Sequence, residues 1–280
     1  MSIENYRTIS KVWDSAIPEL VNPPQGIPLP WWPKFTRYVG GLRPHELTLL
    51  CAPTGAGKTQ LLANICAQVA SQNIPQFVAP VETGDGDFVA RVISAIEKKD
   101  YNQGDPIPVE SVNALTQKYK DVLLSRPVYI TSYDNRVAVE EMQGYLTLMH
   151  QKHRCKIAIL DNLNFFLKVV SAQEERIEMD SAIHTFVVLA KRIPLHVILV
   201  VHPRKTDGGR VESEFDIKGS STAVQEASNV ILFNRPKMDD TQSLPTDREL
   251  VFKKIRKRGI YVNQKILFRF EGGRYEEYRR

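Results

Sequence analysis

A run of small residues that ends in Gly-Lys-Thr is the part of the chain with the clearest chemistry. The loop consists of Ala52, Pro53, Thr54, Gly55, Ala56 and Gly57, followed by Lys58 and Thr59. A triphosphate needs backbone N–H groups turned toward it with no side chains in the way, and a Gly-rich turn at a helix N-terminus provides both. Lys58 is placed to reach the β and γ phosphates, and the Thr59 hydroxyl to hold Mg²⁺. The run therefore predicts a site for ATP and Mg²⁺, with Ala52 as a small residue in place of the first glycine.

The segments on either side of this loop supply the context that a phosphate-binding loop requires. The apolar stretch 47–51 precedes it and predicts a buried strand. Apolar residues at helical spacing follow it, namely Leu61, Leu62, Ile65 and Val69. The alternative is a chance Gly-rich turn, and this strand and helix argue against it.

An acidic residue ends a second apolar run and supplies the metal-side carboxylate that hydrolysis needs. Residues 157–160 are Ile-Ala-Ile-Leu, and Asp161 follows them. The carboxyl ends of parallel strands meet at one edge of a sheet, so we expect Asp161 beside the phosphate-binding loop, within reach of the Mg²⁺ shell. The alternative role for Asp161 is an acidic cap at a strand end.

The residue after Asp161 is Asn162, so the base that activates water must come from elsewhere. Glu82 follows the apolar segment 77–81 and is expected at the same edge, where its carboxylate can orient water toward the γ-phosphate. The alternative is that Glu82 only begins a turn. His202 follows a further apolar run and is a candidate to bind the γ-phosphate and to report hydrolysis to the next loop, although a lone histidine is more often structural.

Four cations and a Gly-Ser turn after His202 are candidate contacts for nucleic-acid phosphates. The cations are Arg204, Lys205, Arg210 and Lys218, and the turn is Gly219 and Ser220, whose N–H groups can bind a phosphate. The same segment holds four acids, so its net charge is zero, which weakens a purely electrostatic argument. Residues 251–280 carry ten Lys and Arg against three Glu. This basic end is either a polyanion-binding surface or a solvated face of terminal strands.

The elements that must position these residues alternate along the chain. We expect strands at 47–51, 77–81, 127–131, 156–160 and 196–201, and helices at 59–71, 86–99, 137–152 and 174–192. Short apolar runs between amphipathic helices predict an α/β fold with a mostly parallel, twisted sheet covered on both faces. Pro80 fits poorly inside a central strand. Later apolar runs at 230–233, 250–252 and 266–270 predict extra C-terminal strands, and 234–248 is expected to be an exposed loop.

The N-terminal forty residues differ from the rest. Apolar residues spaced by three or four predict an amphipathic helix over 1–20, and the proline-rich stretch 21–40 predicts a linker before the main domain, 41–280. The helix is expected either to fold back on its own domain or to reach a neighbouring subunit.

Length and composition fit one large domain with this short appendage. Apolar residues make up 42% of the 280 residues, enough for a full core. There is no apolar run of membrane-spanning length and no N-terminal basic and apolar signal, so we expect no membrane association and a cytoplasmic protein, or a viral one in the host cytoplasm. The three cysteines are widely separated, which fits a reducing compartment and argues against a zinc site.

Taken together, these motifs resemble the hexameric replicative helicases of the DnaB and Twinkle type, which are built on a RecA-like ATPase core. The resemblance extends over residues 40–271 and is carried by 41–59, Glu82, Asp161, 202–205, 218–221 and 225–230. It implies that Glu82 is the catalytic glutamate, Asp161 the metal-side aspartate and His202 the sensor. It also implies a hexameric ring with single-stranded DNA in its channel and replication partner proteins.

A late Lys-x-Arg resembles the family's signature for completing a neighbour's ATP site. By this resemblance Arg256 is an arginine finger and Lys254 a γ-phosphate contact, both acting on the next subunit. Arg258 lies two residues further on, so the sequence leaves open whether Arg256 or Arg258 is the finger. Alternatively, these are ordinary basic residues on an exposed strand.

The expected function is therefore an ATP-dependent nucleic-acid motor, a ring-forming DNA helicase. Two alternatives stay open at this point. One is a recombinase or KaiC-like ATPase that does not unwind DNA, and the other is a nucleotide-dependent loader or assembly protein.

Overall fold

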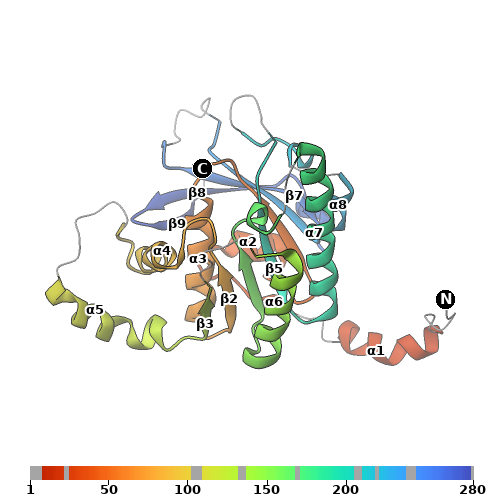
Figure 1. Ribbon diagram of the computed structural model, residues 1–280, viewed down its shortest axis with the longest axis horizontal. Helices are drawn as coiled ribbons and strands as arrows, with labels where there is room; N and C mark the ends of the chain where they lie inside the picture. The colour runs from red at the N-terminus through yellow and green to blue at the C-terminus, as the bar shows by residue number, and fades with distance from the viewer. Residues whose placement is uncertain are drawn as a thin grey trace.

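One twisted sheet organises the molecule (Figure 1). The computed structural model describes residues 8–21, 25–101, 109–131, 137–167, 171–204, 210–217, 221–237 and 244–278. Within these residues the sheet has nine strands in the order β3-β2-β4-β5-β1-β6-β7-β8-β9. The strands are β1 (Leu47–Cys51), β2 (Gln76–Ala79), β3 (Val128–Ile130), β4 (Ile157–Leu160), β5 (His196–Val201), β6 (Asn229–Asn234), β7 (Arg248–Ile255), β8 (Lys265–Glu271) and β9 (Arg274–Tyr278).

The first six strands in this order are parallel, and β7, β8 and β9 continue the sheet as an antiparallel extension. This confirms the predicted α/β fold with a mostly parallel sheet and extra C-terminal strands. β1 is buried along its whole length because it lies at the centre, between β5 and β6. Burial on both faces explains why β1 is apolar on both faces, with only Thr48 polar, rather than alternating between apolar and polar residues.

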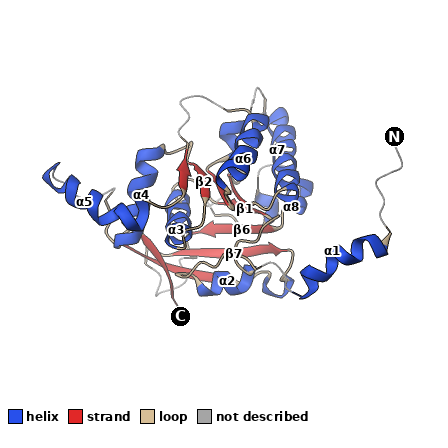
Figure 2. Cartoon of the chain, turned by 90° about the horizontal axis from the view of Figure 1, so that it is seen from below, coloured by secondary structure: helices blue, strands red, loops and turns tan. Residues whose placement is uncertain are grey.

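Helices cover both faces of the sheet (Figure 2). The helices of the domain are α2 (Pro33–Val39), α3 (Lys58–Ser71), α4 (Asp85–Glu97), α5 (Val112–Tyr119), the π-helical segment η2 (Lys120–Leu124), α6 (Val139–His153), α7 (Ala172–Arg192) and α8 (Ser221–Glu226), and α1 (Ile9–Val21) precedes them. Alternate strand residues point to opposite faces, so Leu50 packs with α2, α3 and α4, whereas Leu49 packs with α6 and α7. The helices predicted at 59–71, 86–99, 137–152 and 174–192 are confirmed within two residues at each end.

Two expected boundaries are corrected. β2 ends at Ala79, so Pro80 lies just outside the sheet, where its missing N–H costs no strand pairing and its carbonyl accepts the N–H of Gly84 at 2.8 Å. The segment 234–248 is not wholly an exposed loop, because Asn234 ends β6 and Arg248 begins β7. Asp247 is buried there, where its carboxylate accepts a hydrogen bond from the Tyr278 hydroxyl at 2.8 Å.

The N-terminal region behaves as two parts. α1 projects away from the body of the molecule, with the apolar side chains of Ile9, Trp13 and Leu20 exposed (Figures 1 and 2). Of the expected linker 21–40, residues 22–24 lie outside the described residues, and residues 25–40 are instead packed on the domain because Leu29, Trp32, Phe35 and Val39 are apolar and belong to its core. Pro33 starts helix α2, where the fixed φ of proline suits the first turn.

The C-terminal hairpin is fastened to helix α3. The side-chain amides of Gln60 and Asn64 donate to the carbonyl of Gly273 at 2.6 and 2.9 Å, and Asn64 accepts the N–H of Tyr275 at 2.9 Å. β9 is thereby held against the helix that begins at the phosphate-binding loop. None of the helices in the described residues combines the length and the apolar content needed to cross a bilayer.

Candidate nucleotide-binding site

The predicted phosphate-binding loop joins β1 to α3. Gly57 precedes the first residue of α3 with φ of 90°, a conformation in which only glycine is unstrained. A Cβ on Gly57 would also collide with the hydroxyl of Tyr275. The loop thus reaches the helix N-terminus in the shape that directs N–H groups toward an anion.

Two C-terminal residues support this loop from the side of β7 and β9. The guanidinium of Arg248, at the start of β7, donates from Nε to the carbonyl of Ala56 at 2.5 Å. The buried Tyr275, on β9, lies against Gly57. Sequence reasoning missed both residues because they follow the loop by about two hundred positions, and only the sheet order brings them back to it.

Thr59 and Asp161 lie together below the loop. The Thr59 hydroxyl donates to Asp161 Oδ2 at 2.9 Å, as expected if both serve one metal ion. Asp161 is 0% exposed, and its other oxygen, Oδ1, is buried without a hydrogen-bond partner. A buried carboxylate oxygen without a donor fits the hydration shell of Mg²⁺, which prefers oxygen ligands. Burial raises the pKa of Asp161 to about 6.

Glu82 lies at the same edge and forms an ion pair with Lys58, with 2.7 Å between Oε2 and Nζ. The Asn162 amide also donates to Glu82 Oε2 at 2.6 Å and lies 3.0 Å from His202 Nε2. Burial alone raises the pKa of Glu82, but the hydrogen bond and charge of Lys58, together with Asn162, outweigh it, so the net pKa is lowered. Glu82 is therefore an ionised carboxylate that a lysine and an amide hold in place.

Asn162 is a side chain of this cluster to which the sequence interpretation assigned no role. In the sequence it stands where a glutamate often follows a metal-side aspartate. In the structure it is the residue that joins Glu82 to His202. The signal that could have found it is its position directly after Asp161, at the end of β4.

Arg256 and Lys254 lie at the other end of the strands from this cluster, where the parallel strands begin. β7 is antiparallel to β6, so it begins near the loop at Arg248 and ends at Ile255, paired with Asn229, the first residue of β6. Arg256 Nη2 donates to the carbonyl of Glu226 at 2.9 Å, and Lys254 Nζ donates to that of Gln225. The structure therefore brings Lys58, Thr59, Glu82, Asp161 and His202 together, and places Lys254 and Arg256 out of reach of that site.

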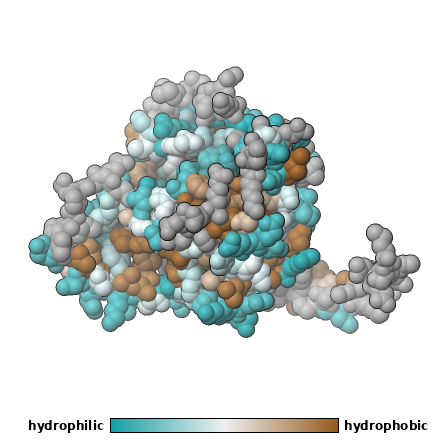
Figure 3. Space-filling model, viewed as in Figure 1, coloured by the Kyte–Doolittle hydropathy of each residue, from teal (hydrophilic) through white to brown (hydrophobic). Residues whose placement is uncertain are grey.

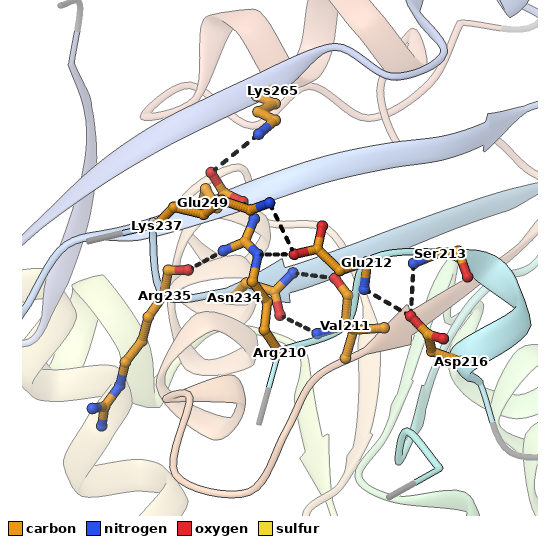
Figure 4. A network of polar contacts seen from close by, with 10 residues as sticks. All are labelled: Arg210, Val211, Glu212, Ser213, Asp216, Asn234, Arg235, Lys237, Glu249 and Lys265. Atoms are coloured by element: carbon orange, nitrogen blue, oxygen red, sulfur yellow. Dashed lines mark hydrogen bonds and ion pairs between the residues drawn. The ribbon is translucent and has the colours of Figure 1, made fainter. Parts of the chain in front are cut away.

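The predicted nucleic-acid contacts have different surroundings. Lys205, Lys218, Gly219 and Ser220 lie outside the described residues. The backbone of Arg204 is held by Asp216, whose carbonyl accepts its N–H at 2.6 Å. Arg210 is turned into the protein and forms an ion pair with Glu249 (Figure 4).

Comparison with known proteins gives one family and a shared fold. A model of the DnaB-like helicase C terminal domain matches residues 31–277. The ATPase domain of G40P is similar in structure, with a TM-score of 0.76, 13% sequence identity, and coverage of 98% of this chain and 100% of that one. A structure described as a DnaB-like replicative helicase and its interactions with primase has a TM-score of 0.75, 14% identity, and coverage of 98% of this chain and 68% of that one.

The two structural likenesses, at such low identity, show the fold alone. The family model covers the phosphate-binding loop and all of the sheet except the last residue of β9. The chain therefore belongs to the DnaB-like helicase C-terminal domain family, whose members are ATP-dependent replicative helicases.

Proposed function

We propose that this chain is the motor of a ring-shaped helicase that hydrolyses Mg²⁺-bound ATP between subunits while it moves along single-stranded DNA. The observation that carries the proposal is that the predicted site residues are divided between the two ends of the parallel strands, which form two opposite edges of the sheet. The loop, Glu82 and Asp161 lie at the edge where these strands end, and Arg256 lies at the edge where they begin. Neighbouring copies arranged head to tail bring the second edge of one subunit to the first edge of the next.

The chain's own residues have distinct roles in this site. The loop amides and Lys58 bind the phosphates, and Thr59 with Asp161 holds the metal. Mg²⁺, when bound, neutralises charge that develops on the phosphate oxygens. Glu82 orients the attacking water and accepts its proton late in the reaction.

The ion pair between Lys58 and Glu82 links binding to catalysis. Lys58 serves either the glutamate or the phosphates. When a γ-phosphate draws the ammonium away, Glu82 loses the partner that lowers its pKa and becomes a better base. Asn162 stays bonded to Glu82 and adjoins His202, so a shift of the carboxylate reaches the loop after β5.

Exposed apolar surfaces at two ends of the molecule support the head-to-tail arrangement. One is α1, which extends from the domain with Ile9, Trp13 and Leu20 exposed. The other lies near the sheet edge at β3, where α5 and η2 expose Val112 and Leu124, in a region where brown surface gathers in Figure 3. An apolar recess of about 170 Å³ adjoins it, lined by Cys66, Val89, Val92, Leu123, Leu124, Arg126, Val128 and Ile130. Two different surfaces of this kind form a heterologous contact, the type of contact from which rings are built when the rotation between subunits closes.

The test measures oligomeric size and ATP hydrolysis with and without single-stranded DNA. We expect a ring in the presence of a non-hydrolysable ATP analogue, and faster hydrolysis when a dT oligonucleotide is added at low salt. Lys58→Ala is the control, since it removes phosphate binding. An active ATPase that single-stranded DNA does not stimulate contradicts the DNA motor. Strand displacement on a forked duplex then distinguishes a helicase from a recombinase, which need not release a strand.

A further inference from the structure

Arg210 is surrounded by internal partners rather than presented to solvent (Figure 4). Its side chain is 17% exposed, and its guanidinium forms an ion pair with Glu249, whose side chain is 4% exposed. It also donates to the carbonyl of Arg235, and to Glu212 at 3.0 Å. A contact with a nucleic-acid phosphate would have to break this nearly buried ion pair and leave Glu249 without its closest cation.

A second contact fastens the same segment at the same place on the sheet. The N–H of Val211 donates to Asn234 Oδ1 at 3.0 Å, and Asn234 Nδ2 donates back to the carbonyl of Val211 at 2.8 Å. Asn234 and Glu249 are paired neighbours in the β6–β7 register. The contacts of Arg210 and of Val211 are therefore both made with this one pair of neighbouring residues in the sheet.

The residues that follow form a compact unit, which we call the platform (210–217). Asp216 Oδ2 accepts the N–H groups of Glu212 and Ser213, both at 2.8 Å, while its carbonyl accepts that of Arg204. Ile217 forms a bridge with Pro203. Arg204 and Ile217 directly precede Lys205 and Lys218, two of the cations predicted from sequence to contact nucleic acid. The platform therefore fixes the backbone at the residue before each of these two predicted contacts.

The strand that holds the platform also holds the phosphate-binding loop. Glu249 and Arg248 are consecutive residues of β7, and consecutive side chains on a strand point to opposite faces. Glu249 binds Arg210 of the platform, and Arg248 binds the carbonyl of Ala56 in the loop. A single peptide unit thus connects the two regions.

We propose that Arg210 is a positioning residue: its ion pair with Glu249 fixes the platform to the strand that supports the phosphate-binding loop, and thereby couples DNA binding to ATP turnover. This inference rests on the proposed function, and it gives Arg210 a different role from the phosphate contact expected from sequence. If charge alone mattered, neutralising Arg210 would weaken DNA binding and neutralising Glu249 would tighten it. If the ion pair matters, neutralising either residue lowers the DNA-stimulated ATPase rate.

The experiment compares Arg210→Gln, Glu249→Gln, the double variant and Arg210→Lys in the full chain. Glu214→Gln is the control, because it removes the same charge as Glu249→Gln from a position on the platform itself. We measure kcat and KM for ATP with and without a dT oligonucleotide, and the salt dependence of DNA binding. Each single Gln variant is expected to lower the DNA-stimulated kcat about fivefold or more, the lower end of usual coupling between sites. The unstimulated kcat and the KM for ATP stay within about twofold, because neither residue touches the nucleotide site.

Three further results are expected from the ion pair. The double variant is no worse than either single variant, because both remove the same interaction. Arg210→Lys restores part of the stimulation, since an ammonium still pairs with Glu249. The salt slope of DNA binding is unchanged in Arg210→Gln, since no phosphate contact is lost.

Other outcomes overturn the proposal. A salt slope reduced by about one in Arg210→Gln, with tighter binding in Glu249→Gln, identifies a phosphate contact instead. An equal loss of stimulated and unstimulated rates in every variant, Arg210→Lys included, identifies a general structural defect.

Amide hydrogen exchange separates this inference from the proposed function. Faster exchange at 211–213 in Glu249→Gln, with unchanged exchange in α3, is expected whether or not DNA binds. Unchanged exchange at 211–213 overturns the ion pair's positioning role. A wild-type chain whose ATPase is insensitive to DNA contradicts the proposed function, while the exchange at 211–213 still reports on the ion pair.

Discussion

At the scale of single residues, Glu82 is the base that the sequence interpretation placed at the end of the second strand, and the structure puts it beside Lys58. We predict that Glu82→Gln retains ATP binding and loses turnover by on the order of a hundredfold, because an amide cannot accept the proton from water. Steady-state hydrolysis and binding of a fluorescent ATP analogue measure the two quantities separately. Normal turnover in Glu82→Gln would assign the base to another residue.

His196, the first residue of β5, gives a prediction for stability rather than for catalysis. It is buried, with Nδ1 2.8 Å from the carbonyl of Arg43 and Nε2 3.1 Å from the Thr48 hydroxyl. Burial lowers its pKa from 6.5 to about 4. Between these values the unfolded chain binds a proton that the folded chain does not, so the free energy of unfolding decreases as the pH falls from 6.5 toward 4, by about 3 kcal/mol in total.

The measurement is urea unfolding of the wild type and His196→Gln at pH 7 and pH 5. Carboxylates change the stability of both proteins alike, so the difference between the two curves isolates His196. We expect the wild type to lose more stability than the variant on acidification. Parallel losses in the two proteins would show that His196 is protonated equally in the folded and unfolded states.

At the scale of elements, Trp32 joins the segment before α2 to the hairpin that supports the phosphate-binding loop. Its indole is buried, its Nε1 donates to the carbonyl of Tyr275 at 2.7 Å, and its ring lies 5.0 Å from that of Phe268. We predict that Trp32→Ala lowers the free energy of unfolding by about 3 to 5 kcal/mol, the usual cost of removing a buried large aromatic side chain. Urea unfolding measures this change.

Two matched variants accompany Trp32→Ala. Trp32→Phe keeps most of the apolar contact and removes the hydrogen bond, so a loss of about 1 kcal/mol is expected. Ile260→Ala alters a side chain that is 83% exposed, and its effect is expected within about 0.5 kcal/mol. A change in Trp32→Ala as small as that of Ile260→Ala would mean that residues 25–40 are not part of the folded domain.

The central strands could be predicted from sequence because burial on both faces requires continuous apolar runs, as in β4. β9 could not be found this way, since Arg-Tyr-Glu-Glu-Tyr has no apolar run and only Tyr275 is buried. The available signal was local: Gly272 and Gly273, both with positive φ, form the turn that returns the chain from β8 to β9. A Gly-Gly pair between two strand-like segments indicates a hairpin.

The same distinction applies to the candidate site. Lys58, Glu82 and Asp161 stand at the ends of strands or at a helix start, so topology alone places them at one edge. Arg248 and Tyr275 support the loop through contacts that depend on how the antiparallel extension packs against the loop and α3. The partners of Arg210 are equally remote, since Glu249 is 39 positions away. These contacts join residues that are far apart in sequence, so no local sequence motif predicts them.

At the scale of the whole molecule, the parallel and antiparallel parts of the sheet position different residues. The parallel strands deliver the loop, Glu82, Asp161 and His202 to one edge, and the antiparallel β7 carries the chain from that edge to the other. Arg248 and Lys254 thus mark the two ends of one strand. One strand thereby connects a subunit's own phosphate-binding loop with the residues proposed to act on its neighbour.

Mixed rings test whether Arg256 acts on the neighbouring subunit. Lys58→Ala and Arg256→Ala are each expected to abolish hydrolysis when alone, because the first lacks phosphate binding and the second lacks the finger. In an equal mixture, about a quarter of the interfaces join an intact Lys58 to an intact Arg256 if the subunits assemble at random. We therefore predict partial recovery of ATPase activity on mixing, measured after the subunits have exchanged.

Two controls make the result specific to Arg256. A mixture of Lys58→Ala with the double variant Lys58→Ala/Arg256→Ala contains no intact site and stays inactive. Arg258→Ala replaces the neighbouring cation, whose guanidinium binds the carbonyl of Arg37 in its own chain at 2.9 Å, so it is expected to keep activity when alone. Recovery with Arg258→Ala in place of Arg256→Ala, from two inactive parents, would move the finger to position 258. Activity of a mixture that never exceeds the mean of its parents would mean that each subunit completes its own site, which the position of Arg256 at the far edge of the sheet argues against.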